Sequence, residues 1–141
     1  LCKEECYRSI YLQVFRNFAP AMFEAFDYSK LPTTLGQRTE SSTPSQALLM
    51  LNSDFLATHA RRWAERLTAE STTAEARIES IYWSALSRPP RPSETAIALE
   101  FVDAQRAEHV AAGSAVSDAE VAAWADYCHV VLNLSELIVV R

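Results

Sequence analysis

Histidine and cysteine are the residues of this chain best suited to acid–base, metal or thiol chemistry, and it has three of each. Cys128 and His129 are neighbours, but adjacent residues on a helix point about 100° apart and do not form a catalytic pair. Haem attachment requires C-x-x-C-H and zinc requires ligands at short paired spacings, and neither pattern occurs. We interpret His59 and His109 as surface or boundary residues and Cys128 as a packing residue. We predict no metal and no cofactor held by this segment alone.

A set of arginine, amide and acidic residues is the best candidate for a binding site. Its arginines could converge in a cleft and clamp a carboxylate or sulfate group. The same residues could instead form buried ion pairs and amide hydrogen bonds that tie the N-terminal half to the helices. We favour the structural interpretation, with Asp27 paired to Arg16 or Arg38. The full set consists of Arg8, Arg16, Asp27, Arg38, Gln46, Asn52, Asn133 and Glu136.

Signatures of covalent catalysis or phosphate binding do not occur in the sequence. There is no G-x-S-x-G turn, and two glycines in the whole chain do not provide a phosphate-binding loop. Glu24 with Asp27, and Glu75 with Glu79, have helical spacing and are interpreted as solvated faces or partners of a helix dipole. We therefore predict no catalytic residue. Whether the chain is an enzyme is left open, and we favour the interpretation that it is not.

Three tryptophans, Trp63, Trp83 and Trp124, fall on three different expected helices. Aromatic rings can stack on sugars, which would make a glycan-binding surface. Tryptophans on separate amphipathic helices are more often core or helix-contact residues, and we favour that interpretation.

The elements that must position these residues are mainly helices. The longest runs from Pro44 to about Ala69, because Thr43 can cap its start, Pro44 suits its first position and Gln46 can complete a capping box. Apolar residues follow at spacings of three and four over its whole length. Residues 52–54 mark a place where this helix could bend, since their side chains compete for backbone hydrogen bonds.

Three further helices are expected after it. The capping-box pattern predicts a start at Thr72 with Glu75, and another at Ser117 with Glu120. Between them, a helix begins at Pro92 and fades near residue 113. A short helix runs from Pro20 to about residue 26.

The two ends of the chain carry weaker signals. Residues 7–18 fit helical spacing, yet their aromatic and β-branched content also suits a strand, and we lean towards an extended segment. Residues 28–42 read as a loop. The β-branched residues 137–140 predict a terminal strand or extended tail. The expected fold is mainly α, with about four substantial helices, an irregular N-terminal arm and this short C-terminal strand or tail.

Length, composition and charge limit the classes of protein to which this chain can belong. The chain has 141 residues, of which 49% are hydrophobic, which suits one domain or the C-terminal half of a larger one. A formal charge of −5 argues against a nucleic-acid partner. No stretch is apolar over the length of a membrane span, and no signal peptide is present. Cys2 and Cys6 stand in poor geometry for a disulfide, and the state of the cysteines is left open.

Several polar motifs occur in an order that resembles a known family. The chain is similar to the uncharacterised C-terminal domain of large secreted proteins from planctomycetes and related bacteria, and specifically to its C-terminal half. Gln13 departs from the family, where proline is often expected after Tyr-Leu. The motifs that carry the resemblance are residues 8–12, 16–17, 23–27, 36–38, 43–48, 51–52, 86–90 and 132–137.

The resemblance implies an exported protein, in the periplasm or on the cell surface, whose upstream part usually contains a cytochrome c domain. Haem c would then belong to that upstream domain of the parent protein. The expected partners are the upstream domains of the same polypeptide and a protein or polysaccharide. The expected function is a non-catalytic structural or interaction module. The alternative is part of an extracytoplasmic enzyme or glycan-binding unit whose site is shared with the missing upstream half.

Overall fold

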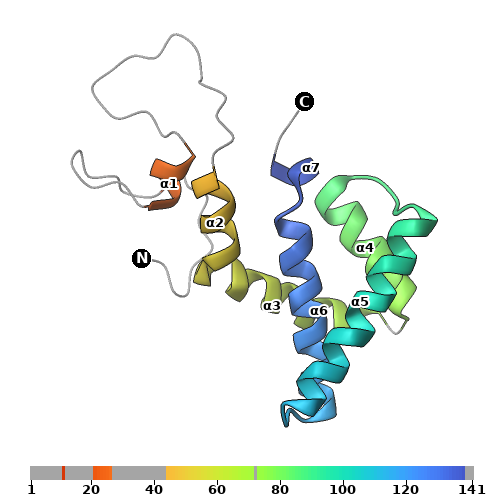
Figure 1. The fold of residues 1–141 in the computed structure, drawn as a ribbon. Helices are drawn as coiled ribbons and strands as arrows, with labels where there is room; N and C mark the ends of the chain where they lie inside the picture. The colour runs from red at the N-terminus through yellow and green to blue at the C-terminus, as the bar shows by residue number, and fades with distance from the viewer. Residues whose placement is uncertain (1–10, 12–20, 27–43, 72, 139–141) are drawn as a thin grey trace, which may run out of the picture. The chain divides into compact units, whose positions relative to one another are not determined.

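The computed structural model describes residues 11, 21–26, 44–71 and 73–138, which divide between two compact units, Leu1–Leu49 and Met50–Arg141. Every regular element in these ranges is a helix (Figure 1), which confirms the mainly α prediction. The expected arm at residues 7–18 and the loop at 28–42 lie almost entirely outside the described residues. The helices are α1 (Ala21–Ala25), α2 (Pro44–Asn52), α3 (Asp54–Glu70), α4 (Ala74–Leu86), α5 (Pro92–Ala111), α6 (Val116–Leu132) and α7 (Ser135–Ile138).

The expected long helix from Pro44 is divided into α2 and α3. Ser53 separates them with an extended backbone, at φ −80° and ψ 116°. The break falls at the three residues whose side chains compete with the helical backbone for hydrogen bonds, so the expected bend is confirmed. The helix resumes at once, because the Ala57 N–H donates to the Ser53 carbonyl at 3.0 Å.

Two of the expected helix starts are displaced. At α4 the cap is Thr73 instead of Thr72: the Thr73 hydroxyl accepts a hydrogen bond from the Ala76 N–H at 3.3 Å. Two adjacent threonines can each cap a helix, and the second has the extended backbone that a cap requires. At α6 the cap position is Ala115, so Ser117 lies inside the first turn and Glu120 is used elsewhere.

The start of α5 agrees with the sequence. Pro92 is its first residue, and the Glu94 carboxylate accepts a hydrogen bond from the Arg91 N–H at 2.7 Å. The helix ends in a turn at Gly113, whose φ of 93° is one that glycine adopts without strain. The Ser114 N–H donates back to the His109 carbonyl at 3.1 Å and closes that turn.

The core of the 50–141 unit is built on α6. Its inward face contributes Ala119, Ala123, Trp124, Tyr127, Cys128 and Val131. This face packs against α3 and α5, and α4 covers a further part of the same core (Figure 1). Ala60 and Ala64 of α3 belong to the same buried cluster as the Trp124 ring, which is fully buried. None of the helices that the structure describes is long and apolar enough to cross a membrane.

The predicted C-terminal strand is wrong at Leu137 and Ile138, which form the end of the short helix α7. Both amides donate to the Leu134 carbonyl, at 3.0 and 3.3 Å, so the chain closes one more helical turn after Asn133. A strand needs a partner strand for these groups, and a local turn pairs them without one. Residues 139–141 lie outside the described part of the chain.

Close packing between α3 and α6 gives a first prediction. Ala64 on α3 is fully buried, so Ala64→Leu must displace the neighbouring core residues. We expect the free energy of unfolding to fall by about 1–3 kcal/mol in urea denaturation. Ala69→Leu, at an exposed position of the same helix, is the control and should change stability little. Equal effects of the two substitutions would contradict the proposed packing.

Candidate functional site

Four of the eight predicted site residues lie in the part of the chain that the structure describes. Arg8, Arg16, Asp27 and Arg38 lie outside it, together with the predicted pairing of Asp27. Of the others, Gln46 lies within α2 and Asn52 at its end. Asn133 donates from Nδ2 to the His129 carbonyl at 2.8 Å and so closes the end of α6, whereas Glu136 pairs with Arg88.

The guanidinium of Arg88 is the centre of the first polar cluster. Ser87 ends α4 in a left-handed conformation, at φ 54°, which turns the chain and places Arg88 at the start of the α4–α5 connection. Two parallel hydrogen bonds of 2.9 Å join Arg88 to Glu94 on α5. Two more, of 2.7 and 2.9 Å, join it to Glu136 on α7.

Arg88 has no N–H donor left for a ligand. Its remaining N–H donates to the Pro89 carbonyl at 3.1 Å, and the guanidinium lies over the Tyr82 ring at 5.3 Å. Two bidentate carboxylates and one carbonyl together occupy every donor that arginine has. The hydrogen bonds from Arg88 and from the Arg91 N–H lower the pKa of Glu94 to about 2, so this carboxylate stays charged at neutral pH. The cluster is therefore a closed ion-pair network.

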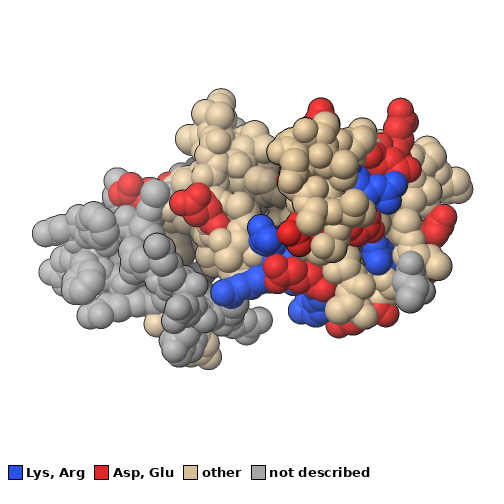
Figure 2. Space-filling model, turned by 90° about the horizontal axis from the view of Figure 1, so that it is seen from below, with Lys and Arg blue, Asp and Glu red and all other residues tan. Residues whose placement is uncertain are grey.

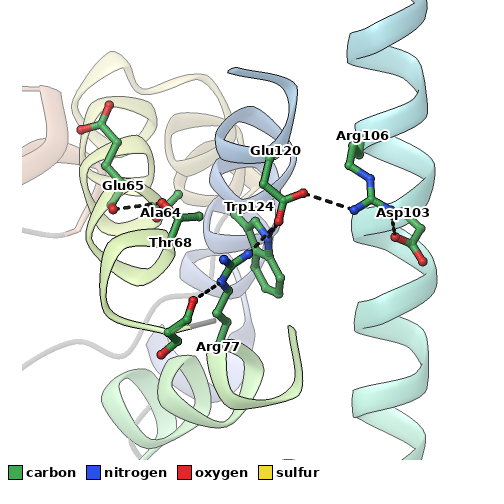
Figure 3. Close-up of polar contacts among 9 residues, drawn as sticks. Ala64, Glu65, Thr68, Arg77, Asp103, Arg106, Glu120 and Trp124 are labelled. Atoms are coloured by element: carbon green, nitrogen blue, oxygen red, sulfur yellow. Dashed lines mark hydrogen bonds and ion pairs between the residues drawn. The ribbon is translucent and has the colours of Figure 1, made fainter. Parts of the chain in front are cut away.

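The second polar cluster surrounds Glu120 in the first half of α6 (Figure 3). One oxygen of this carboxylate accepts hydrogen bonds from Arg77 at 2.7 Å and from the indole N–H of Trp124 at 2.9 Å. The other oxygen accepts from Arg106 at 3.3 Å, and Arg106 also pairs with Asp103. Glu120 thus connects α4, α5 and α6.

Arg77 extends this cluster towards α3. Its Nε donates to the Ser71 carbonyl at 2.9 Å, and its guanidinium lies over the Trp124 ring at 5.4 Å. Burial acts to raise the pKa of Glu120, but the hydrogen bonds from Trp124, Arg77 and Arg106 outweigh it and lower the pKa below its usual value. A carboxylate held in the charged form by three donors is a poor proton donor, so Glu120 is suited to holding helices together.

His109 and His129 also have structural partners, and Cys128 is buried. His109 on α5 pairs with Asp126 on α6, Nε2 to Oδ2, at 2.7 Å, and His129 bonds the Met50 carbonyl at 3.2 Å. Burial raises the pKa of the Cys128 thiol to about 12, so it stays protonated and unreactive at neutral pH. Within the described ranges, no three His, Cys, Asp or Glu side chains are placed to hold a metal ion.

Sequence reasoning missed most members of both clusters. The sequence predicts only a capping role for Glu120, and nothing in the spacing indicates Arg77 or Arg106. Arg88 belongs to residues 86–90, one of the motifs that carry the family resemblance, but this motif does not indicate its two carboxylate partners. These contacts join residues up to 48 positions apart, and a single sequence carries no signal for that distance. Among the tryptophans, Trp124 is buried as predicted, whereas Trp83 is 52% exposed.

The Glu120 cluster predicts a charge-specific loss of stability. Glu120→Gln can keep the Trp124 hydrogen bond but leaves Arg77, only 11% exposed, without its charged partner. We expect a loss of about 1–3 kcal/mol in the free energy of unfolding. Glu108→Gln on the exposed face of α5 removes one negative charge at a distance and is the control. If both variants lost the same amount, net charge and not the cluster would explain the effect.

The lowered pKa of Glu94 predicts a loss of stability in acid. The folded pKa is about 2 and the ordinary value is 4.5, so the stabilisation is fully present above about pH 4.5 and is lost as the pH falls towards 2. Urea denaturation across this range should show a steeper fall for the unaltered chain than for Glu94→Gln. Glu100→Gln, an exposed change on the same helix, controls for the removal of one charge. Parallel curves for the unaltered chain and Glu94→Gln would refute the role given to Arg88.

Cys128 predicts slow chemical labelling. A buried thiol with a raised pKa should react with iodoacetamide at neutral pH only when the chain unfolds. Mass spectrometry of the peptide that contains Cys128 should find labelling in urea and almost none without it. Rapid labelling of the folded chain would show that the thiol is accessible.

A protein-family model matches a large part of the chain. The family described as PSD1, protein of unknown function (DUF1553), matches residues 2–102. No curated protein and no solved structure gives a significant match. The matched range includes Arg77, Arg88 and Glu94 and ends within α5, before the start of α6. Because the match covers more than half of the chain, this protein belongs to the PSD1 family of proteins of unknown function (DUF1553).

Proposed function

We propose that this chain is a non-catalytic structural or interaction module of an exported, cytochrome c-linked multidomain protein of planctomycete type. The observation that carries the proposal is the saturation of Arg88, whose N–H donors all go to Glu94, Glu136 and Pro89. A guanidinium used in this way holds three segments of the chain together and has no donor left for a substrate. The Arg88 site therefore supports a structural function and not a catalytic one.

The other reactive groups support the same function. Glu120 is charged and shared among three donors, and the Cys128 thiol is buried and protonated. Catalytic groups need a pKa near the working pH and access to a substrate, and neither group has both. Acidic and basic side chains lie next to one another on the face seen in Figure 2, which suits a surface of mutual ion pairs.

Export and the cytochrome link rest on the resemblance of the polar motifs, such as residues 8–12 and 43–48. In this proposal the module acts next to a haem-bearing upstream domain in the periplasm or at the cell surface. It contacts that domain, or a protein or polysaccharide partner, through its surface. The haem would be held by the upstream domain and not by this chain.

The alternative, a shared enzyme or glycan-binding site, requires Arg8, Arg38 and Asp27 to converge. These residues lie outside the described part of the chain, and no contact among the described residues supports the hypothesis of a shared enzyme or glycan-binding site.

Fractionation and cross-linking of the full parent protein test the proposal. We expect the parent in the periplasmic or surface fraction, with covalently bound haem detected by its absorption after reduction in pyridine. Cross-links should join residues 50–141 to another domain. Glu108→Gln and Glu120→Gln parents that remain folded should keep any activity of the unaltered parent. A cytoplasmic parent without haem, or activity lost in a folded Glu120→Gln parent, would overturn the proposal.

A further inference from the structure

The last described segment of the chain, residues 134–138, is held less firmly than the helix before it. We call it the C-terminal strap. Val131 on α6 is 1% exposed, whereas no residue of α7 is fully buried. The backbone hydrogen bonds of Leu137 and Ile138 both end on Leu134, inside the strap itself. Opening the strap would break the hydrogen bond of 3.1 Å from the Leu134 N–H to the Val131 carbonyl and the limited contacts of α7 with α4 and α6.

Apolar contact of the strap with the core is partial. Leu134 packs against the core cluster and is half-buried, as are Leu137 and Ile138. The strap contacts α4 and α6. Half-buried side chains contribute less burial free energy than the fully buried residues of α6, such as Trp124.

The ion pair between Glu136 and Arg88 joins the strap to the segment between α4 and α5. The Glu136 side chain is 51% exposed, so salt and water reach this pair. Opening would not leave Arg88 isolated, because Glu94 and the Pro89 carbonyl would still accept its hydrogen bonds. Glu94 is itself held by the Arg91 N–H. One half of the network can thus open while the other half remains in place.

We propose that the C-terminal strap is a releasable element, fastened by Glu136 to Arg88, which opens while α3 to α6 remain folded. In the closed state it covers the end of α4, where the Arg88 guanidinium lies over the Tyr82 ring. In the open state it exposes the apolar side chains of Leu134, Leu137 and Ile138, together with the donors of Arg88 that Glu136 had occupied. The function proposed above rests on the closed state of this strap, in which every N–H of Arg88 is already bonded.

Millisecond hydrogen exchange of the whole chain, followed by mass spectrometry, tests the strap. Removing the charge in Glu136→Gln should speed exchange in residues 134–138 by about two- to fivefold, as expected for an exposed ion pair. Exchange in residues 119–131 of α6 should not change. Asp103→Asn, which removes another exposed ion pair at Arg106, is the matched control and should leave the strap unaffected.

Salt provides a second, independent measurement. In about 1 M NaCl, where charges are screened beyond about 3 Å, strap exchange should accelerate in the unaltered chain and hardly at all in Glu136→Gln. Two results would overturn the proposal. In one, the strap exchanges only as fast as α6, so that it opens only with global unfolding. In the other, strap exchange in the unaltered chain already equals that of an unfolded peptide, so that there is no closed state.

Discussion

The burial of α6 is the constraint on which the rest of the 50–141 unit depends. The helices α3, α4, α5 and α7 all contact it, and its inner face contributes the largest fully buried side chain, Trp124. The α3 residues of the same buried cluster include two small ones, Ala60 and Ala64. The Trp124 ring brings a polar N–H into the core, and burying that group without a partner would be costly. The Glu120 carboxylate accepts a hydrogen bond from this N–H, but it also brings a negative charge close to the core.

The negative charge of Glu120 also requires partners. A carboxylate near the core must be paired, and Arg77 and Arg106 come from two further helices to do so. One buried aromatic ring thus leads to a chain of ion pairs across α4, α5 and α6. Arg88 has a similar role with the charges reversed, since one cation is shared by two carboxylates. The first network joins α4, α5 and α6, and the second joins the α4–α5 connection to α5 and α7.

The two ion-pair networks suit a structural function. Charged groups that satisfy one another are fixed in position and in protonation state, which suits a rigid support and suits catalysis poorly. The family match ends at residue 102, so Arg77, Arg88 and Glu94 lie inside it, whereas Glu120, Trp124 and Glu136 follow it. Residues on both sides of that boundary are needed to complete each network. The segment after residue 102 is therefore an integral part of this unit.

Sequence patterns alone predict the mainly α class, the break near Ser53, the start of α5 at Pro92 and the packing role of Cys128. These features depend on local signals, namely apolar spacing, side chains that compete with the backbone, and the fixed φ of proline. Three features emerge only in the folded chain: Glu120 leaves its expected capping role, Arg88 joins Glu94 to Glu136, and Leu137 belongs to a helical turn. Each of these outcomes depends on a partner distant in the sequence or on a choice between two locally acceptable conformations. Ion pairs across 43 or 48 positions follow from how the helices pack, and periodicity within one helix contains no information about that packing.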